Sequence, residues 1–291
     1  MIDAQGNRSS IDLSKIENRR IACFSLDVEH DYGTLSQVPQ YEGLKNIPRL
    51  VGLFKDLDMP LTCFVQGSLF ETHPEEINRF FDLDVEIEPH SYSHPSPEKM
   101  NFDFEVKKSC SVYKECVGST PLGYRSPDGY VNSERYYETL FKSGIKYDSS
   151  IFPSFRPGRF NHMNYPTQPY SVFDGKILEL PFSVLSPYLR IPISLSYFKL
   201  FGRYGLQALQ WFPLPDLIIF DFHLHDLTRL SNVDTIIEQN SLSYSNSMIL
   251  KRTYCNKGNQ GFSFLEKFIE MLNSNGYEYT KLEDIYWRLT S

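Results

Sequence analysis

Two histidines four residues apart could bind one metal ion together. His90 and His94 flank the short stretch Ser-Tyr-Ser. On a helical turn, residues i and i+4 lie on one face, so both imidazole rings could reach the same ion. The alternative is a pair of loop histidines, one of which caps or packs. The spacing predicts a pair of metal ligands and leaves the structural alternative open.

An acidic cluster follows the first apolar stretch and contains Asp27 and Glu29, separated by one residue. In an extended strand, residues i and i+2 point the same way. Two carboxylates on one face repel each other unless a cation or a proton relieves them. One could therefore bind a metal while the other takes a proton from a bound water. A solvated pair at a turn has the same pattern, and His30 and Asp31 are candidates too.

A second polar stretch runs from Arg125 to Gly129 and contains Pro127. Arg125 could form a bidentate pair with a carboxylate and fix its orientation. The proline and the glycine shape the loop so that a backbone N–H can face a substrate. An exposed arginine beside a turn is the alternative.

A third polar stretch ends an apolar strand and contains His223 and His225. These residues alternate onto one face of an extended chain, so both could face a site. A histidine there could donate a proton to a leaving amine. The alternative is one core histidine and one surface histidine, and we expect only one of the two to be functional.

The elements that must position these residues alternate along the chain. Apolar runs predict strands at 20–26, 61–65, 85–88, 122–124, 145–147, 171–173, 177–180 and 217–220, with a hairpin joining 171–173 to 177–180. Helical spacing and caps predict helices at 43–58, from Pro74 with Thr72 as cap, and at 103–116, 133–142, 197–210 and 262–274, with a polar loop at 231–260.

This alternation predicts a largely parallel sheet with crossover helices in one domain over residues 20–291, after a flexible lead-in at 1–19. In such folds functional groups gather at the carboxyl ends of the strands. The polar stretches all follow strands, so we expect them to meet at one site.

Composition narrows the class of protein. The net charge of −7 and the pI near 5.5 come without a basic stripe, which argues against a nucleic-acid partner. The sequence contains no run of about 18 apolar residues, so no membrane-spanning helix is predicted. The polar N-terminus shows no secretory signal, and the five cysteines lack paired spacing. We expect a protein of the reducing cytoplasm.

In their order along the chain, these stretches resemble the motifs of the NodB-type polysaccharide deacetylases, carbohydrate esterase family 4, over roughly residues 20–230. The resemblance implies a distorted (β/α) barrel of seven or fewer repeats. It also implies a divalent metal, usually zinc, held by one carboxylate and two histidines. The stretches that resemble the family's second to fifth motifs are His90–His94, Arg125–Gly129, Glu179–Pro181 and His223–Asp226.

The first motif departs from the family pattern. Most members end it in two adjacent aspartates, whereas Asp-Val-Glu at 27–29 is similar to an Asp-Val-Asp/Glu subgroup. That likeness implies Asp27 as the catalytic base, oriented by Arg125. It implies Glu29, His90 and His94 as ligands of zinc, with Co²⁺, Mn²⁺ or Ni²⁺ as other possible ions.

The resemblance also assigns roles on the substrate side. Asp128 stands where many members carry an aromatic residue, and its backbone N–H, next to Pro127, would face the oxyanion. His223 is followed three residues later by Asp226, as in the subgroup, and is therefore favoured over His225 as the acid. The implied reaction is removal of an N-acetyl group from an amino sugar by hydrolysis.

Other readings of the same residues remain. The apolar, aromatic stretch 183–219 fits a barrel wall best, but it could form a surface helix at a membrane interface, where a lipid-linked sugar would lie. Without a signal, a glycan-assembly intermediate is the expected substrate. A deformylase, an allantoinase-like amide hydrolase and a non-catalytic glycan-binding member share these motifs. A structural metal module would need four closed ligands.

Overall fold

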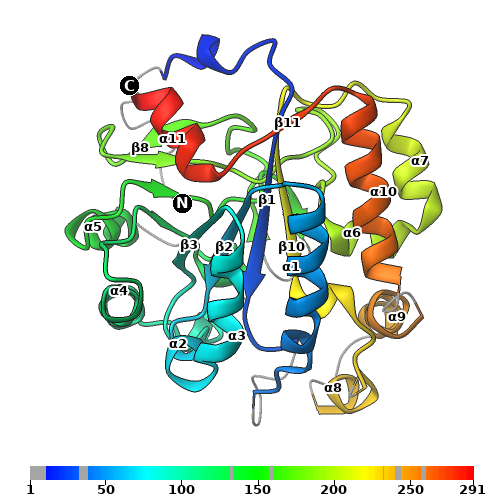
Figure 1. Ribbon diagram of the computed structural model, residues 1–291, viewed down its shortest axis with the longest axis horizontal. Coiled ribbons are helices and arrows are strands. Elements are labelled where there is room, and N and C mark those ends of the chain that lie inside the picture. The colour runs from blue at the N-terminus through cyan, green and yellow to red at the C-terminus, as the bar shows by residue number, and fades with distance from the viewer. Residues whose placement is uncertain are drawn as a thin grey trace.

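The computed structural model describes residues 11–32, 39–131, 134–156, 160–231, 233–239, 244–256 and 260–291. Its larger sheet is parallel throughout and has β1 at its centre (Figure 1). In spatial order its strands are β10 (Leu217–His223), β1 (Ile21–Val28), β2 (Leu61–Val65) and β3 (Val85–Pro89), with β11 (Glu278–Tyr279) paired to β1.

A smaller sheet completes the ring. Its strands are β4 (Gly123–Tyr124), β5 (Tyr147–Asp148) and β9 (Ile177–Glu179), which are parallel, and β8 (Tyr170–Val172), which is antiparallel to β9. Single backbone hydrogen bonds join the two sheets: Arg125 N–H donates to Pro89 at 3.2 Å and Ser183 N–H donates to Ile219 at 3.1 Å. The result is a distorted (β/α) barrel, as the resemblance implied.

Helices cover the outside of this barrel (Figure 1). They are α1 (Ile47–Asp56), α2 (Ser68–Thr72), α3 (Pro74–Asn78), α4 (Phe102–Val117), α5 (Glu134–Lys142), α6 (Leu195–Phe201), α7 (Arg203–Leu209), α8 (Val233–Gln239), α9 (Tyr244–Leu250), α10 (Gly261–Ser274) and α11 (Leu282–Thr290). A π-helical turn, Lys251–Asn256, follows α9, and a two-stranded ribbon pairs β6 (Phe155–Arg156) with β7 (Phe160–Asn161).

Aromatic side chains fill the space between the large sheet and the helices on its outer face. Phe24 of β1 lies 5.1 Å, ring to ring, from Phe220 of β10, which in turn lies 4.6 Å from Phe268 of α10. Phe198 of α6 packs against Phe268 at 4.9 Å. Such aromatic pairs stabilise a core beyond the area that they bury. They hold β1, β10 and α6 in fixed relation, and these elements carry much of the site.

Three expectations about local structure are wrong. The helix predicted at 197–210 is broken at Gly202, whose φ of 64° and ψ of −151° are open only to glycine. The segment 231–260 is not a polar loop, because α8, α9 and the π-helical turn occupy its described parts. Thr72 does not cap the helix that begins at Pro74, since its hydroxyl donates to the Ser68 carbonyl instead.

The predicted lead-in is described from residue 11 onward. Ile16 is buried against the barrel, beside Ile21 and Leu282. A short 3-10 turn, Leu13–Lys15, precedes it, and Asp12 caps this turn. The remainder of the lead-in lies outside the described residues, and the boundary at residue 20 stays a prediction.

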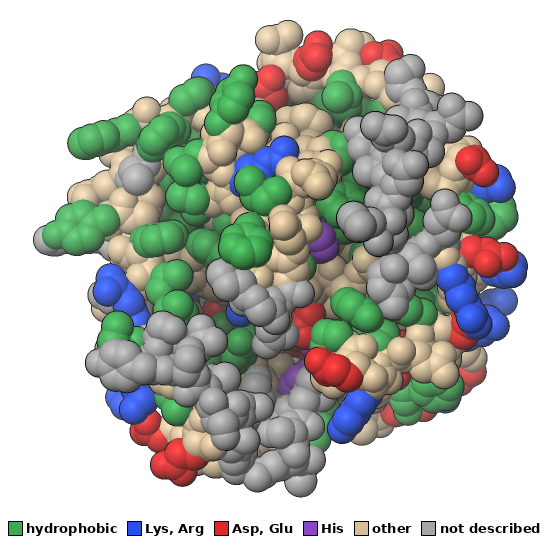
Figure 2. All heavy atoms as spheres, turned by 180° about the vertical axis from the view of Figure 1, so that it is seen from behind, with side chains coloured by type: hydrophobic (Ala, Val, Ile, Leu, Met, Phe, Trp, Pro, Cys, Tyr) green, Lys and Arg blue, Asp and Glu red, His purple; other side chains and the backbone are tan. Residues whose placement is uncertain are grey.

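Hydrophobic side chains are numerous on part of the face that Figure 2 shows. Seen from behind, these side chains gather on the side of the molecule where α7 lies (Figure 2). None of the helices in the described part of the chain is long and apolar enough to span a bilayer.

Candidate metal centre

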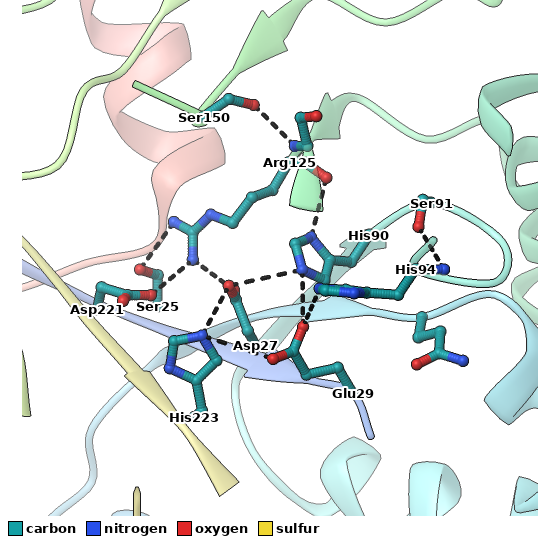
Figure 3. Close-up of polar contacts among 12 residues, drawn as sticks. Ser25, Asp27, Glu29, His90, Ser91, His94, Arg125, Ser150, Asp221 and His223 are labelled. Atoms are coloured by element: carbon teal, nitrogen blue, oxygen red, sulfur yellow. Dashed lines mark hydrogen bonds and ion pairs between the residues drawn. The ribbon is translucent and has the colours of Figure 1, made fainter. Parts of the chain in front are cut away.

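The carboxyl ends of four strands bring the predicted residues together (Figure 3). Asp27 lies near the end of β1 and is the register partner of His223 on β10. His90 follows the last residue of β3, and Arg125 follows the last residue of β4. The expectation that the polar stretches meet at one place therefore holds in the structure.

Glu29, His90 and His94 converge on one point. Oε2 of Glu29 lies 3.2 Å from Nε2 of His90 and 2.5 Å from Nε2 of His94. All three side chains are buried, and their potential ligand atoms lie within 4.8 Å of one another. Two imidazole nitrogens and a carboxylate oxygen at such distances form a donor set that suits a divalent metal such as zinc.

His90 is also held in the tautomer that a ligand needs. Its Nδ1 lies 2.9 Å from the carbonyl oxygen of Arg125. A proton on Nδ1 satisfies that carbonyl and leaves the lone pair of Nε2 directed at Glu29. Hydrogen bonding of the second ring nitrogen is the usual way in which proteins orient a metal-binding histidine.

The loop that carries the two histidines is not helical, contrary to the helical turn considered from the spacing. Ser91 and His94 have positive φ values of 55° and 51°, a region that non-glycine residues enter at a cost. The Ser91 hydroxyl accepts a hydrogen bond from the His94 N–H at 3.0 Å. The left-handed backbone conformation of Ser91 and His94 brings both rings to Glu29, and residue spacing does not predict it.

Glu105 of α4 anchors this loop from outside. One of its carboxylate oxygens accepts the backbone N–H groups of Tyr92 at 2.8 Å and Ser93 at 2.7 Å, and the other accepts the Ser93 hydroxyl at 2.7 Å. Glu105 is buried, so these bonds are shielded from water. Glu105 was not among the residues predicted from the sequence; it is the one buried acidic side chain of α4.

The electrostatics of the cluster keep Glu29 ionised. Burial alone would raise the pKa of Glu29, but His94 and His90 beside it hold that pKa well below its usual value. Burial alone would lower the pKa of His94, and the Glu29 carboxylate raises it instead. A carboxylate that is buried and negative provides the charge that a metal cation requires.

Asp27 faces a different partner. Its Oδ1 accepts a hydrogen bond from Arg125 at 2.6 Å. Its Oδ2 lies 3.7 Å from Nε2 of His90 and 3.6 Å from Nε2 of His223. Asp27 therefore lies beside the Glu29 cluster with one oxygen fixed and the other directed between the two histidines (Figure 3).

Arg125 is buried and every one of its guanidinium nitrogens is engaged. Nε donates to the carbonyl of Ser149 at 2.8 Å, and the terminal nitrogens donate to the hydroxyls of Ser25 and Ser149 and to the two carboxylates of Asp27 and Asp221. The guanidinium carbon Cζ lies over the rings of Phe64 and Phe182, 4.0 and 4.3 Å from their centroids. The alternative of an exposed surface arginine is wrong.

Asp221 is a member of the site that the sequence analysis did not select. It is buried on β10, two residues before His223 and therefore on the same face. Arg125 donates to it at 3.2 Å, and burial raises the pKa of Asp221 to about 7. An aspartate between Phe220 and Phe222 in an otherwise apolar strand was the available signal.

His223 is paired with Asp226 by two contacts. Its Nδ1 lies 3.3 Å from Oδ2 of Asp226, and its backbone N–H donates to the same oxygen at 3.1 Å. Burial would lower the pKa of His223, but the surrounding carboxylates of Asp221 and Asp226 raise it well above its usual value. The protonated ring directs Nε2 at Asp27 and Glu29, where a leaving group could take the proton.

Two side chains of α6 support this pair. The Ser196 hydroxyl lies 3.0 Å from each carboxylate oxygen of Asp226. Lys199 is fully buried, donates to the Asp226 carbonyl at 2.7 Å and lies 3.8 Å from Oδ1. Burial lowers the pKa of Lys199 to about 8. His223 and Lys199 together hold the pKa of Asp226 below its ordinary value. Ser196 and Lys199 were absent from the sequence prediction.

The remaining candidates lie elsewhere or act differently. Burial and the neighbouring His223 lower the pKa of His225 to about 3, so His225 is neutral and stacks on His223 at 4.7 Å. His30 contacts Gln66 through its backbone and its ring. Asp31 accepts the backbone N–H groups of Glu42 and Gly43 and so positions the turn before α1.

The loop after β4 forms a 3-10 turn, Pro127–Gly129, beside His94. Asp128 has a positive φ of 54°, and its carboxylate contributes to the raised pKa of His94. Pro127 is buried. Glu179 of the fourth motif does not reach the cluster; it accepts the backbone N–H groups of residues 150 and 151 and so shapes the end of the small sheet.

These features define a class of protein: a (β/α) barrel with a histidine and carboxylate cluster at the carboxyl ends of its strands. Residues 32–146 match the family described as polysaccharide deacetylase. The matched segment contains His90, His94 and Arg125, while Asp27 and Glu29 precede it. The resemblance to the polysaccharide deacetylases that the motifs indicated is thereby confirmed.

Known proteins agree with this assignment. A peptidoglycan deacetylase from Helicobacter pylori (strain ATCC 700392 / 26695) is 36% identical over 114 residues, which are 38% of this chain and 39% of that protein. The chain thus matches about two fifths of the relative's length.

Solved structures confirm the fold. A protein from Mycobacterium smegmatis, assigned as a polysaccharide deacetylase, superimposes with a TM-score of 0.60 at 20% identity over 94% of this chain and 91% of that one. An allantoinase superimposes with a TM-score of 0.54 at 17% identity over 93% and 90%.

Proposed function

We propose that the chain is a metal-dependent carbohydrate N-deacetylase. The convergence of Glu29, His90 and His94, between the Asp27–Arg125 pair on one side and His223 on the other, is the observation that carries the proposal. The likeness to a peptidoglycan deacetylase supports an N-acetylated amino sugar as the substrate. The base and ligand roles follow the Asp-Val-Asp/Glu subgroup assignment, which is part of the proposal.

Glu29, His90 and His94 would hold the ion, for which we propose zinc, since two imidazoles and one carboxylate are a common catalytic zinc set with a position left open. When bound, zinc supplies a Lewis acid for the acetyl carbonyl and lowers the pKa of a bound water. Cobalt, manganese or nickel can take the same donors.

Asp27 acts as the general base and removes the proton of the attacking water through Oδ2. Arg125 holds Oδ1 at 2.6 Å, so the carboxylate presents a single oxygen in a fixed direction. The buried Asp221 and the ring of Phe64 keep the guanidinium in place. In this proposal Asp27 accepts the proton of the water, and Glu29 supplies the negative charge that binds the metal cation.

His223 protonates the leaving amine through Nε2. Asp226 fixes the opposite ring nitrogen and favours the charged form, which makes His223 the acid rather than the neutral His225. The backbone N–H of Asp128, held beside Pro127 in the tight turn of the loop, would stabilise the developing oxyanion. Acetate and a free amino sugar are the products.

For the substrate we propose an intermediate of glycan assembly, carried on a lipid and met in the cytoplasm at a membrane surface. The described cysteines are all free thiols, and Cys23 and Cys63 are buried, as expected for a reducing compartment. Membrane contact would then be peripheral. Fractionation of cells that express the intact chain tests the compartment.

The experiment that tests the reaction separates metal binding from turnover. We expect Asp27→Asn to retain the metal while turnover falls by roughly two to four orders of magnitude, the usual loss on removal of a general base. Glu29→Gln should lose the metal. Asp56→Asn and Glu75→Gln, the same changes at exposed positions, are the controls and should alter neither. Metal content and acetate release from an acetylated amino-sugar oligomer are measured.

The outcomes are distinct. Loss of metal from Asp27→Asn with retention in Glu29→Gln would reverse the two roles. Release of formate from a formylated sugar, without acetate from an acetylated one, would make the enzyme a deformylase. Tight glycan binding by a metal-loaded protein that hydrolyses neither would indicate a non-catalytic member.

A further inference from the structure

A groove of about 650 Å³ lies between α6, α7 and α9 on the outside of the barrel. Nearly all of its lining is aliphatic or aromatic, and Arg252 is the one charged side chain among the lining residues. Residues that form its walls include Ile193, Tyr197, Phe201, Tyr204, Met248 and Ile249. A hollow of this composition suits an apolar occupant.

The surface around the groove exposes large hydrophobic side chains. Tyr188 is 96% exposed, Trp211 is 85% exposed and Tyr204 is 65% exposed. We call the full set the aromatic face; it comprises Tyr188, Leu189, Phe201, Tyr204, Trp211, Phe212, Met248 and Ile249. Figure 2 shows hydrophobic side chains gathered on the side of the molecule where α7 lies. Four members of the aromatic face, Phe201, Tyr204, Met248 and Ile249, line the groove itself. Exposed hydrophobic side chains gathered at a groove indicate an interaction site.

Basic side chains border the same face. A second hollow of about 550 Å³ shares Phe201, Tyr204 and Arg252 with the groove and is also lined by Lys267. Neither hollow has an acidic residue in its lining. Arg252 and Lys267 are exposed, and neither forms an ion pair with another residue that the structure describes. An apolar groove thus continues into a cationic one.

We propose that the aromatic face docks on the surface of a bilayer that contains anionic lipid. Tryptophan and tyrosine side chains settle at the level of the headgroups, and arginine and lysine beside them pair with lipid phosphates. That the bound membrane presents the lipid-linked substrate rests on the function proposed above. Docking itself does not.

Helix α6 contacts both the proposed active site and the groove, so docking at the groove would place a membrane close to the site. One side of α6 carries Ser196 and Lys199, which hold Asp226 and through it His223. The other side carries Tyr197 and Phe201, which line the groove. A lipid surface seated on α6 therefore lies one helix away from the proton donor, so a sugar attached to a lipid phosphate is presented near the site.

A second copy of the chain is the main competing occupant. In a two-fold dimer each patch meets its own copy. The uncompensated cations Arg252 and Lys267 would then face the same cations, at a cost in repulsion. An anionic lipid surface meets the same groups with attraction, and therefore we commit to the bilayer.

The test is co-sedimentation of the intact chain with vesicles of phosphatidylcholine alone and with an equal part of phosphatidylglycerol. We expect binding to the anionic vesicles. Arg252→Gln with Lys267→Gln should weaken it about 25-fold, since each charge contributes about fivefold. Tyr204→Ser with Trp211→Ser should weaken it by on the order of tenfold per side chain.

Matched controls carry the same changes elsewhere. Phe81→Ser with Trp287→Ser removes two side chains that are 51% and 53% exposed. Lys55→Gln with Lys114→Gln removes two exposed charges. Both control pairs should bind as the unmodified chain does. Thermal unfolding of every variant verifies that these surface changes leave the barrel intact.

Two results would overturn the proposal: absence of binding to either kind of vesicle, or equal losses in the control pairs. A change of mass in light scattering caused by the aromatic variants, without vesicle binding, would assign the face to a dimer and also overturn it. Acetate release from a lipid-free oligosaccharide is measured in parallel. Vesicle binding without any hydrolysis would refute the proposed function and leave the docking intact.

Discussion

Replacement of Arg125 by methionine should destabilise the protein strongly, because Arg125 is the buried cation that lies between two carboxylates. In the variant, Asp27 and Asp221 lose their partner while they remain buried. Loss of one partner of a buried ion pair costs about 3–5 kcal/mol. Methionine fills much of the space, so most of this cost is electrostatic rather than a cavity.

The cost has a built-in limit that can be measured. Burial already raises the pKa of Asp221 to about 7, so this aspartate can take up a proton once the guanidinium is gone. Adding Asp221→Asn to Arg125→Met removes one of the two carboxylates that the loss of Arg125 leaves without a cation. We therefore expect the double variant to be more stable than the sum of the single changes predicts, with a coupling free energy of about 1–3 kcal/mol.

Urea unfolding followed by far-UV circular dichroism at neutral pH, with a chelator present, measures these free energies without a contribution from bound metal. Arg135→Met is the matched control: Arg135 pairs with Asp103 at the surface, and its loss should cost at most about 1 kcal/mol. A cost below about 1 kcal/mol for Arg125→Met, or strictly additive costs in the double variant, would refute the reasoning.

Two further changes test the loop and the second histidine. Glu105→Ala removes the hydrogen bonds to the backbone of residues 92 and 93, and it should weaken metal binding by about tenfold or more in a competition titration with a chromophoric chelator. Glu115→Ala, on the exposed side of the same helix, is the control and should leave the affinity unchanged. Equal affinities of the two variants would show that the loop keeps its conformation without Glu105. His225 stays neutral in the folded chain because its pKa is lowered to about 3, so the unfolded chain takes up its proton first as the pH falls below about 6.5, and stability is lost from there downward. His225→Leu lacks this titration, so its stability relative to the unmodified chain should improve by about 2 kcal/mol between about pH 7.5 and pH 5 in urea unfolding; an unchanged difference would mean that His225 is charged in the folded state.

Much of the fold follows from local pattern. The run at 61–65 is mostly apolar, and the run at 85–88 alternates apolar and acidic residues; both are short. The structure has strands at both places. The end of β10 was harder to predict, because its last residues alternate between phenylalanine and polar side chains and so interrupt the apolar run at 220. Strand pairing with β1 extends β10 to His223, and pairing is not visible in one segment alone.

The missed helices have a similar cause. Segments α8 and α9 are short, and a seven-residue helix has little stability of its own. Val233 and Ile236 are buried with Leu250 and Tyr254 in a small cluster, so tertiary packing supplies what local propensity lacks. At Gly202 the sequence predicted one helix where the structure has two. The apolar spacing continues across Gly202, and only its backbone conformation reveals the break between α6 and α7.

The two acids of the first motif show where sequence reasoning stops. Asp27 and Glu29 have the same charge, lie two residues apart and leave β1 on the same face, so their spacing gives each an equal claim to either role. Their neighbours distinguish them: Asp27 is opposite the arginine that follows β4, whereas Glu29 is opposite the two histidines that follow β3. The guanidinium of Arg125 fixes Asp27, whereas the two imidazoles that converge on Glu29 complete the donor set proposed for the metal. The proposed division of roles therefore follows from the order of the strands in the barrel, which brings a different partner to each acid.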